Sequence, residues 1–110
     1  MNIHSIRYKY GFLNKLSDRK KLANNYLIPP NIPENILSLI EENELMALNG
    51  TFGIKEGTHP VEYDSLRIQT EGNHCEIEVY NKGASLIMEE TPELKRIFPV
   101  CCKLQELFRL

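Results

Sequence analysis

The chain has no tryptophan, no long apolar run and no apolar segment behind its basic start. A membrane-spanning helix needs about 20 mostly apolar residues, and runs such as Phe98–Cys102 are far shorter. Residues 1–10 include basic side chains but lack the apolar core of a secretory signal. The sequence therefore predicts a cytoplasmic protein without a membrane segment or a secretory leader.

Cysteine is scarce, with Cys75, Cys101 and Cys102 as its three positions. An odd number that includes an adjacent pair is a poor disulfide framework. We therefore expect thiols that pack as small apolar side chains. The alternative is a soft-metal site at Cys101 and Cys102, but no further cysteine or histidine lies at ligand spacing. The prediction is no metal and no cofactor.

Motifs of the common enzyme classes are also missing. The chain contains no serine-nucleophile elbow, no phosphate-binding glycine loop and no dinucleotide fingerprint. His74 and Glu76 form the H-x-E pattern of zinc deaminases, but Cys101 and Cys102 lack the spacing of that family's two cysteine ligands. A small enzyme built on His74, Cys75 and Glu76 is the least favoured alternative. We predict that the protein is not an enzyme.

Charge of both signs is present, but it is unevenly distributed. Residues 1–28 hold six basic side chains and one acidic one, whereas residues 29–110 hold seven basic and fourteen acidic ones. Such asymmetry concerns partners rather than fold. The basic segment could bind nucleic acid or an acidic protein surface. We disfavour nucleic acid because the isoelectric point is near 5.9 and dedicated binders present a basic domain.

Length and apolar spacing predict one domain over residues 1–110 with three helices. The first helix is expected over 11–28, and the second begins at Pro33 and ends before Gly50. The third is C-terminal, and Pro99 is expected to break and restart it because proline lacks the backbone N–H. Two N-terminal helices and one C-terminal helix result.

Alternation of apolar and polar residues predicts an antiparallel sheet of three to five strands. Residues 1–10 form an arm or an edge strand, and short strands are expected over 51–55 and 84–89. A central hairpin joins 66–70 to 75–79. The predicted fold is α+β, with the C-terminal helix packed on the sheet.

The hairpin register follows from its turn. A two-residue turn at Gly72-Asn73 would pair Ile68 with Ile77 and Leu66 with Val79 on the core face. The same register would pair Arg67 with Glu78 on the opposite face, which we expect to be exposed.

Acidic and tyrosine residues gather around this hairpin. Tyrosine supplies rigid contact area at interfaces, and carboxylates steer basic partners. The alternative is an ordinary exposed sheet face with one weak ion pair. The predicted partner-binding residues are Glu62, Tyr63, Asp64, Glu71, Glu76, Glu78 and Tyr80.

In size, acidity and lack of catalytic motifs, the chain resembles the small immunity and inhibitor proteins that bacteria use against toxic enzymes. The resemblance is one of composition. It implies a protein that covers the basic active-site groove of a nuclease-like toxin with its acidic sheet face. The alternative is a non-catalytic adaptor subunit that binds an acidic partner through its basic N-terminal residues. One version of this alternative is a homodimer.

Overall fold

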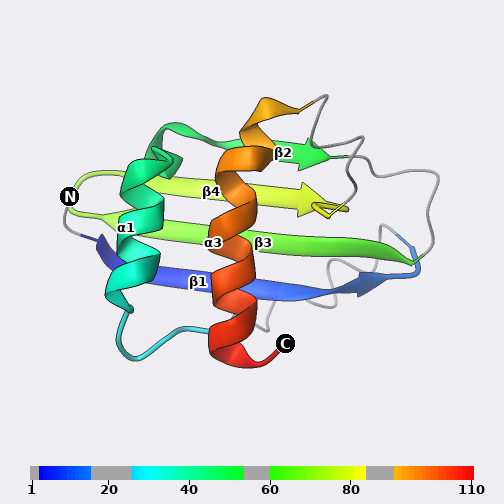
Figure 1. The fold of residues 1–110 in the computed structure, drawn as a ribbon, viewed down its shortest axis with the longest axis horizontal. Helices are drawn as coiled ribbons and strands as arrows, with labels where there is room; N and C mark the ends of the chain where they lie inside the picture. Colours follow the sequence, from blue (N-terminus) through cyan, green and yellow to red (C-terminus); the bar gives the residue numbers. More distant parts are fainter. Residues whose placement is uncertain (1–2, 16–25, 54–59, 84–90) are drawn as a thin grey trace.

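The computed structural model describes residues 3–15, 26–53, 60–83 and 91–110. In these ranges a four-stranded sheet is accompanied by two α-helices and a short 3₁₀ helix. Both α-helices cross the same face of the sheet (Figure 1). The elements are β1 (Ile3–Leu13), α1 (Glu34–Glu42), the 3₁₀ helix (Leu45–Ala47), β2 (Gly50–Gly53), β3 (Val61–Thr70), β4 (His74–Tyr80) and α3 (Pro92–Phe108).

The sheet has the strand order β1-β3-β4-β2. β1 and β4 both pair antiparallel with β3, whereas β2 pairs parallel with β4. The predicted α+β fold is confirmed, but the prediction of a purely antiparallel sheet is wrong at β2. The hairpin turn determines the direction of β4 relative to β3. No short turn joins β2 to β4, so local sequence carries no signal for their parallel pairing.

The predicted first helix over 11–28 is wrong at both of its ends. β1 continues to Leu13, which pairs with Val61. At the other end, Leu27 forms a β-bridge with Tyr8 through two backbone hydrogen bonds of 3.0 and 2.7 Å. Residues 16–25 lie outside the described ranges, as does the strand predicted over 84–89. Strand pairing overrides the helical spacing because Leu13 is buried beside Val61. Of the two alternatives for residues 1–10, an arm or an edge strand, the structure has the strand: β1 lies at one edge of the sheet.

The hairpin forms, but its register differs from the prediction by two residues. Leu66 pairs with Ile77 and Ile68 with Cys75. Gly72 has a φ of 129°, in the region that favours glycine. Because side chains alternate with a period of two, a two-residue shift leaves every side chain on its predicted face. The hairpin side chains therefore lie on the predicted faces of the sheet, although the predicted register is wrong.

The C-terminal helix α3 is continuous, so the predicted break at Pro99 is wrong. A proline inside a helix costs about 3 kcal/mol through its missing hydrogen bond and its ring. Ile97, Val100 and Leu104, on both sides of Pro99, are fully buried. A fully buried aliphatic side chain contributes about 1.5–3 kcal/mol. Packing against the sheet therefore outweighs the cost of the proline.

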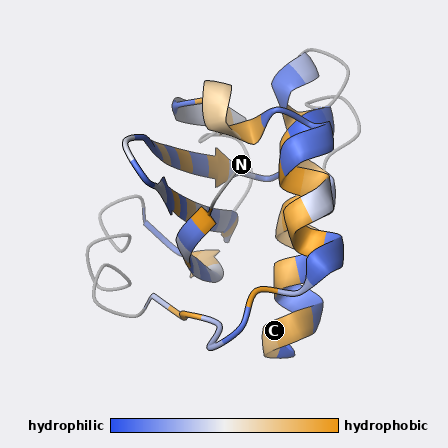
Figure 2. Cartoon of the chain, turned by 90° about the vertical axis from the view of Figure 1, so that its left-hand side faces the viewer, coloured by the Kyte–Doolittle hydropathy of each residue, from blue (hydrophilic) through white to orange (hydrophobic). Residues whose placement is uncertain are grey.

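The main core lies between the sheet and the helices, which form two layers (Figure 2). It contains Ile6, Leu66, Ile68, Ile77 and Val79 from the strands, together with the buried residues of α1 and α3. At the hairpin end, the opposite face of the sheet carries polar side chains. No helix in the described part of the chain is both long and apolar enough to span a membrane.

Candidate functional site

The seven predicted partner-binding residues do not form one surface. Tyr63, Asp64 and Tyr80 are buried, with exposed fractions of 1%, 0% and 0%. Glu62 is also mostly enclosed, with its side chain 24% exposed. Among the acidic members, Glu71 and Glu76 are exposed and Glu78 is half-buried.

The period of the strand explains this division. Residues 62, 64, 66 and 68 of β3 share one face, because side chains alternate along a strand. Leu66 and Ile68 belong to the core under the helices, so Glu62 and Asp64 point to the same side. Glu76 and Glu78 belong to the other face. This alternation is already visible in the sequence, and it contradicts the prediction that residues 62–64 lie together on one surface.

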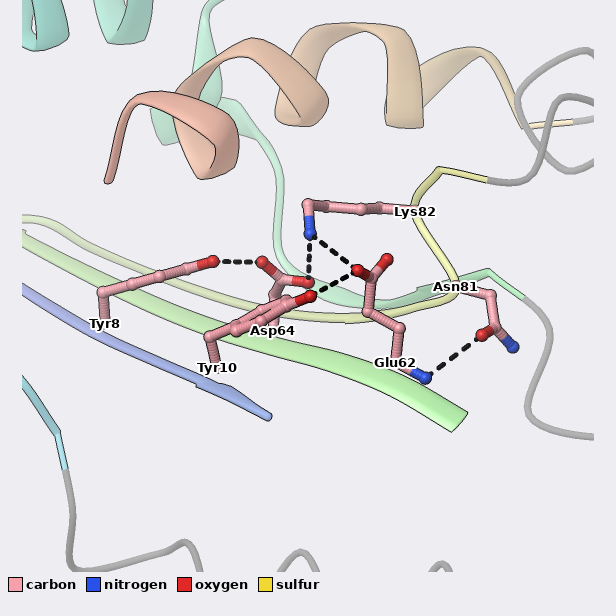
Figure 3. Close-up of polar contacts among 6 residues, drawn as sticks. All are labelled: Tyr8, Tyr10, Glu62, Asp64, Asn81 and Lys82. Atoms are coloured by element: carbon pink, nitrogen blue, oxygen red, sulfur yellow. Dashed lines mark hydrogen bonds and ion pairs between the residues drawn. The ribbon is translucent and has the colours of Figure 1, made fainter. Parts of the chain in front are cut away.

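Glu62 and Asp64 enter a buried ion cluster with Lys82 (Figure 3). The Lys82 ammonium lies 3.1 Å from Asp64 Oδ1 and 3.5 Å from Glu62 Oε2. The Tyr8 hydroxyl donates a hydrogen bond to Asp64, and the Tyr10 hydroxyl donates one to Glu62 at 2.5 Å. Every buried polar side-chain atom in the described ranges has a partner. The cluster thus satisfies its own charges, and sequence reasoning did not single out Lys82.

The electrostatics of the cluster are dominated by burial. Burial raises the pKa of Asp64 to about 6, although the Lys82 charge and the Tyr8 hydrogen bond act in the opposite direction. Burial also raises the pKa of Tyr8 and of Tyr10, so both remain hydrogen-bond donors. Asp64 and Lys82 are 0% and 3% exposed, so a substrate cannot reach them. The ion cluster therefore holds Lys82, which follows β4, against β3, and it does not form an acid–base catalytic site.

The cysteines also lie in the interior. Cys75 and Cys101 are buried, as predicted, and Cys102 is half-buried. The Cys75 thiol donates to the backbone oxygens of Leu45 and Leu48. Burial raises the pKa of Cys75 to about 11 and that of Cys101 well above its ordinary value. Thiols held protonated in this way are poor nucleophiles. No three histidine, cysteine, aspartate or glutamate residues of the described ranges are grouped to hold a metal ion.

The exposed half of the sheet lies on the face opposite the helices, near the hairpin. Three strands contribute to it in register. Two adjoining hollows of about 250 and 170 Å³ lie along it. The acidic side chains belong to β4, and the cationic ones belong to β1 and β3. The rows across the strands are Ser5–Gln69–His74 and Arg7–Arg67–Glu76, which have exposed members, and Lys9–Ser65–Glu78, in which Lys9 and Ser65 are buried.

Tyr26 lies against this face and contacts two of its cations. Its hydroxyl is hydrogen-bonded to Ser65 Oγ at 2.8 Å. Its ring centroid is 4.3 Å from the Lys9 ammonium and 4.9 Å from the Arg67 guanidinium. Sequence reasoning missed Tyr26 because it placed this residue in a helix over 11–28 and assigned it no contact with the sheet.

Comparison with known proteins finds no matching family model, no matching curated protein and no matching solved structure. The class is therefore defined by the fold alone: in the described ranges, a two-layer α+β arrangement with both α-helices on one sheet face and exposed charged side chains at the hairpin end of the other.

Proposed function

We propose that this is a non-enzymatic protein-binding protein of the immunity or inhibitor type, acting in the cytoplasm. The observation that carries the proposal is the uncovered hairpin end of the sheet, where charged side chains from three strands stand at the surface. Glu71 and Glu76 are exposed there, beside the half-buried Glu78. This smaller set replaces the seven-residue surface expected from the sequence.

Binding is favoured over catalysis by where the reactive groups lie. The thiols of Cys75 and Cys101 are buried and held protonated. Asp64, the carboxyl group with the raised pKa, is enclosed by its own partners. The exposed groups are ordinary surface charges, which suit electrostatic recognition of another protein.

The chemistry of the partner follows from the arrangement of charge. Glu71 at the hairpin tip and Glu76 on β4 would face basic groups, as on the substrate groove of a nuclease-like enzyme. Arg7 and Arg67, on the neighbouring strands, would face acidic groups at the rim of that groove. Covering a groove requires no catalytic residue on the inhibitor.

The second candidate is an adaptor that self-associates through β2. This four-residue strand is at the edge of the sheet, and its outer side has no partner strand among the described residues. Exposed strand edges pair readily with a second chain. Light scattering separates the two candidates, because a free inhibitor is expected to be a monomer and this adaptor a dimer.

The test uses two variants with the same change in charge. Glu71→Lys/Glu76→Lys reverses the open face, and Glu34→Lys/Glu42→Lys reverses exposed positions on α1, in the helix layer. Each tagged protein captures partners from its native lysate at low and high salt, followed by mass spectrometry. A basic enzyme retained by the wild type and the α1 variant, but lost from the sheet variant, supports the proposal. Equal retention by all three proteins refutes the assigned face.

A further inference from the structure

Two arginines lie directly opposite each other on the open face. Arg7 of β1 and Arg67 of β3 are paired in the antiparallel register. Both are exposed, and the Arg67 side chain is 48% exposed. Like charges directly opposite on neighbouring strands are destabilising. A negatively charged group bound between the two arginines would attract both of them and offset this repulsion.

A hollow of about 170 Å³ lies at this pair. Besides the arginines, its lining includes the side-chain donors Ser5, Gln69 and His74, as well as Glu76. Ser5 pairs with Gln69, and Gln69 with His74, in the row next to the arginines. Three strands thus bring hydroxyl, amide, imidazole and guanidinium groups to one place. The volume admits a group such as phosphate with room for water.

The surroundings hold Arg67 in position. Its guanidinium contacts the Tyr26 ring at 4.9 Å, and its Nε lies 3.9 Å from Glu76 Oε1. A contact with an aromatic ring uses none of the guanidinium N–H donors, which remain for a ligand. Lys9, one row further along β1 and in contact with the same ring, adds a third positive charge nearby.

We propose that this hollow binds a phosphate group, either as inorganic phosphate or as the phosphate of a larger monoester. Each guanidinium group can donate a bidentate pair of hydrogen bonds. Two such groups therefore suit the four oxygens of a tetrahedral phosphate dianion better than they suit the two oxygens of a carboxylate ligand. Gln69 and Ser5 supply neutral donors to the remaining oxygens. The inference is independent of the proposed function, because it requires no protein partner.

The test is a titration of the ¹⁵N-labelled full chain with inorganic phosphate, AMP and adenosine, followed by NMR at constant ionic strength in sodium chloride. We expect saturable shifts in the hollow with phosphate and AMP, and none with adenosine. Similar affinity for the two anions assigns the site to the phosphate alone, and tighter AMP binding assigns it to a monoester. Shifts with adenosine, or none with either anion, overturn the proposal.

Variants complete the test. Arg7→Ala and Arg67→Ala should each weaken phosphate binding by about tenfold or more, the effect of one charged hydrogen-bonded group. Lys95→Ala, at an exposed position of α3, removes the same charge away from the hollow and should leave binding unchanged. Glu76→Gln should tighten binding, because it removes a carboxylate from the lining, and a gain cannot come from unfolding. Equal binding by wild type, the two arginine variants and Glu76→Gln would refute the site.

Discussion

Replacing Lys82 with methionine should expose the energetic role of the buried ion cluster. The substitution keeps the length of the side chain and removes its charge. Asp64, which is fully buried, would then lose the cation 3.1 Å away. Breaking a buried ion pair by removing one partner costs roughly 3–5 kcal/mol, because the remaining charge is uncompensated.

The pH at which the variant is measured limits this cost. Lys82 lowers the pKa of Asp64, so its removal should raise that pKa further above the present value of about 6. A carboxyl group whose pKa is raised in the folded state destabilises the folded protein most strongly above that raised pKa. This destabilisation disappears as the pH falls to the ordinary pKa of the aspartate, 3.8. The wild-type Asp64 already has a pKa of about 6. At 1.36 kcal/mol per pH unit, protonating Asp64 in the variant therefore limits the loss relative to the wild type to about 1.4 kcal/mol at pH 7 and to almost nothing at pH 5.

Urea unfolding followed by circular dichroism at both pH values measures these differences. Lys82→Met should lose about 1 kcal/mol at pH 7 and little at pH 5, where Asp64 is already protonated in the wild type. Adding Asp64→Asn to it should restore much of the loss, because the unpaired charge is gone. Lys95→Met, at an exposed helix position, is the matched control and should stay within about 0.5 kcal/mol of the wild type. An equal loss at pH 5 and pH 7, or no recovery in the double variant, would refute the reasoning.

Two further substitutions test the packing of the sheet and of α3. Gly53→Ala should cost at least about 2 kcal/mol, because its Cβ would lie 1.9 Å from the Tyr80 carbonyl oxygen at a φ of +94°. Gly83→Ala meets nothing within 4 Å and is its control, so equal melting temperatures for the two would contradict the pairing of β2 with β4. Pro99→Ala should stabilise the protein by about 1–2 kcal/mol, because the restored helix hydrogen bond and the relief of the ring clash outweigh the unfolded-state entropy that the substitution adds. A loss of stability on thermal unfolding would show that the proline ring itself packs favourably.

The sequence by itself determined the local elements and their faces. Alternation in β3 and β4 predicted which residues face the core, although the register is shifted by two. Pro33 correctly indicated the start of α1, and the apolar stripe of the C-terminal segment predicted α3. These features depend on neighbours close in the chain, and they repeat with the period of the backbone. The predicted end of the second helix before Gly50 is wrong, because α1 ends at Glu42 and Glu44 takes a left-handed conformation before the 3₁₀ helix.

The tertiary structure alone decided which elements meet and what they enclose. Residues 11–13 are strand because they pair with residues 61–63, and no local propensity contains that contact. Lys82 follows a turn and would be exposed in isolation, yet it is buried beside Asp64 with α3 close by, where it influences the pKa of Cys101 and of Cys102. Arg7 and Arg67 face each other across 60 positions of chain only because β1 and β3 pair. Such contacts depend on the burial and pairing of distant segments, whereas periodicity describes each segment alone.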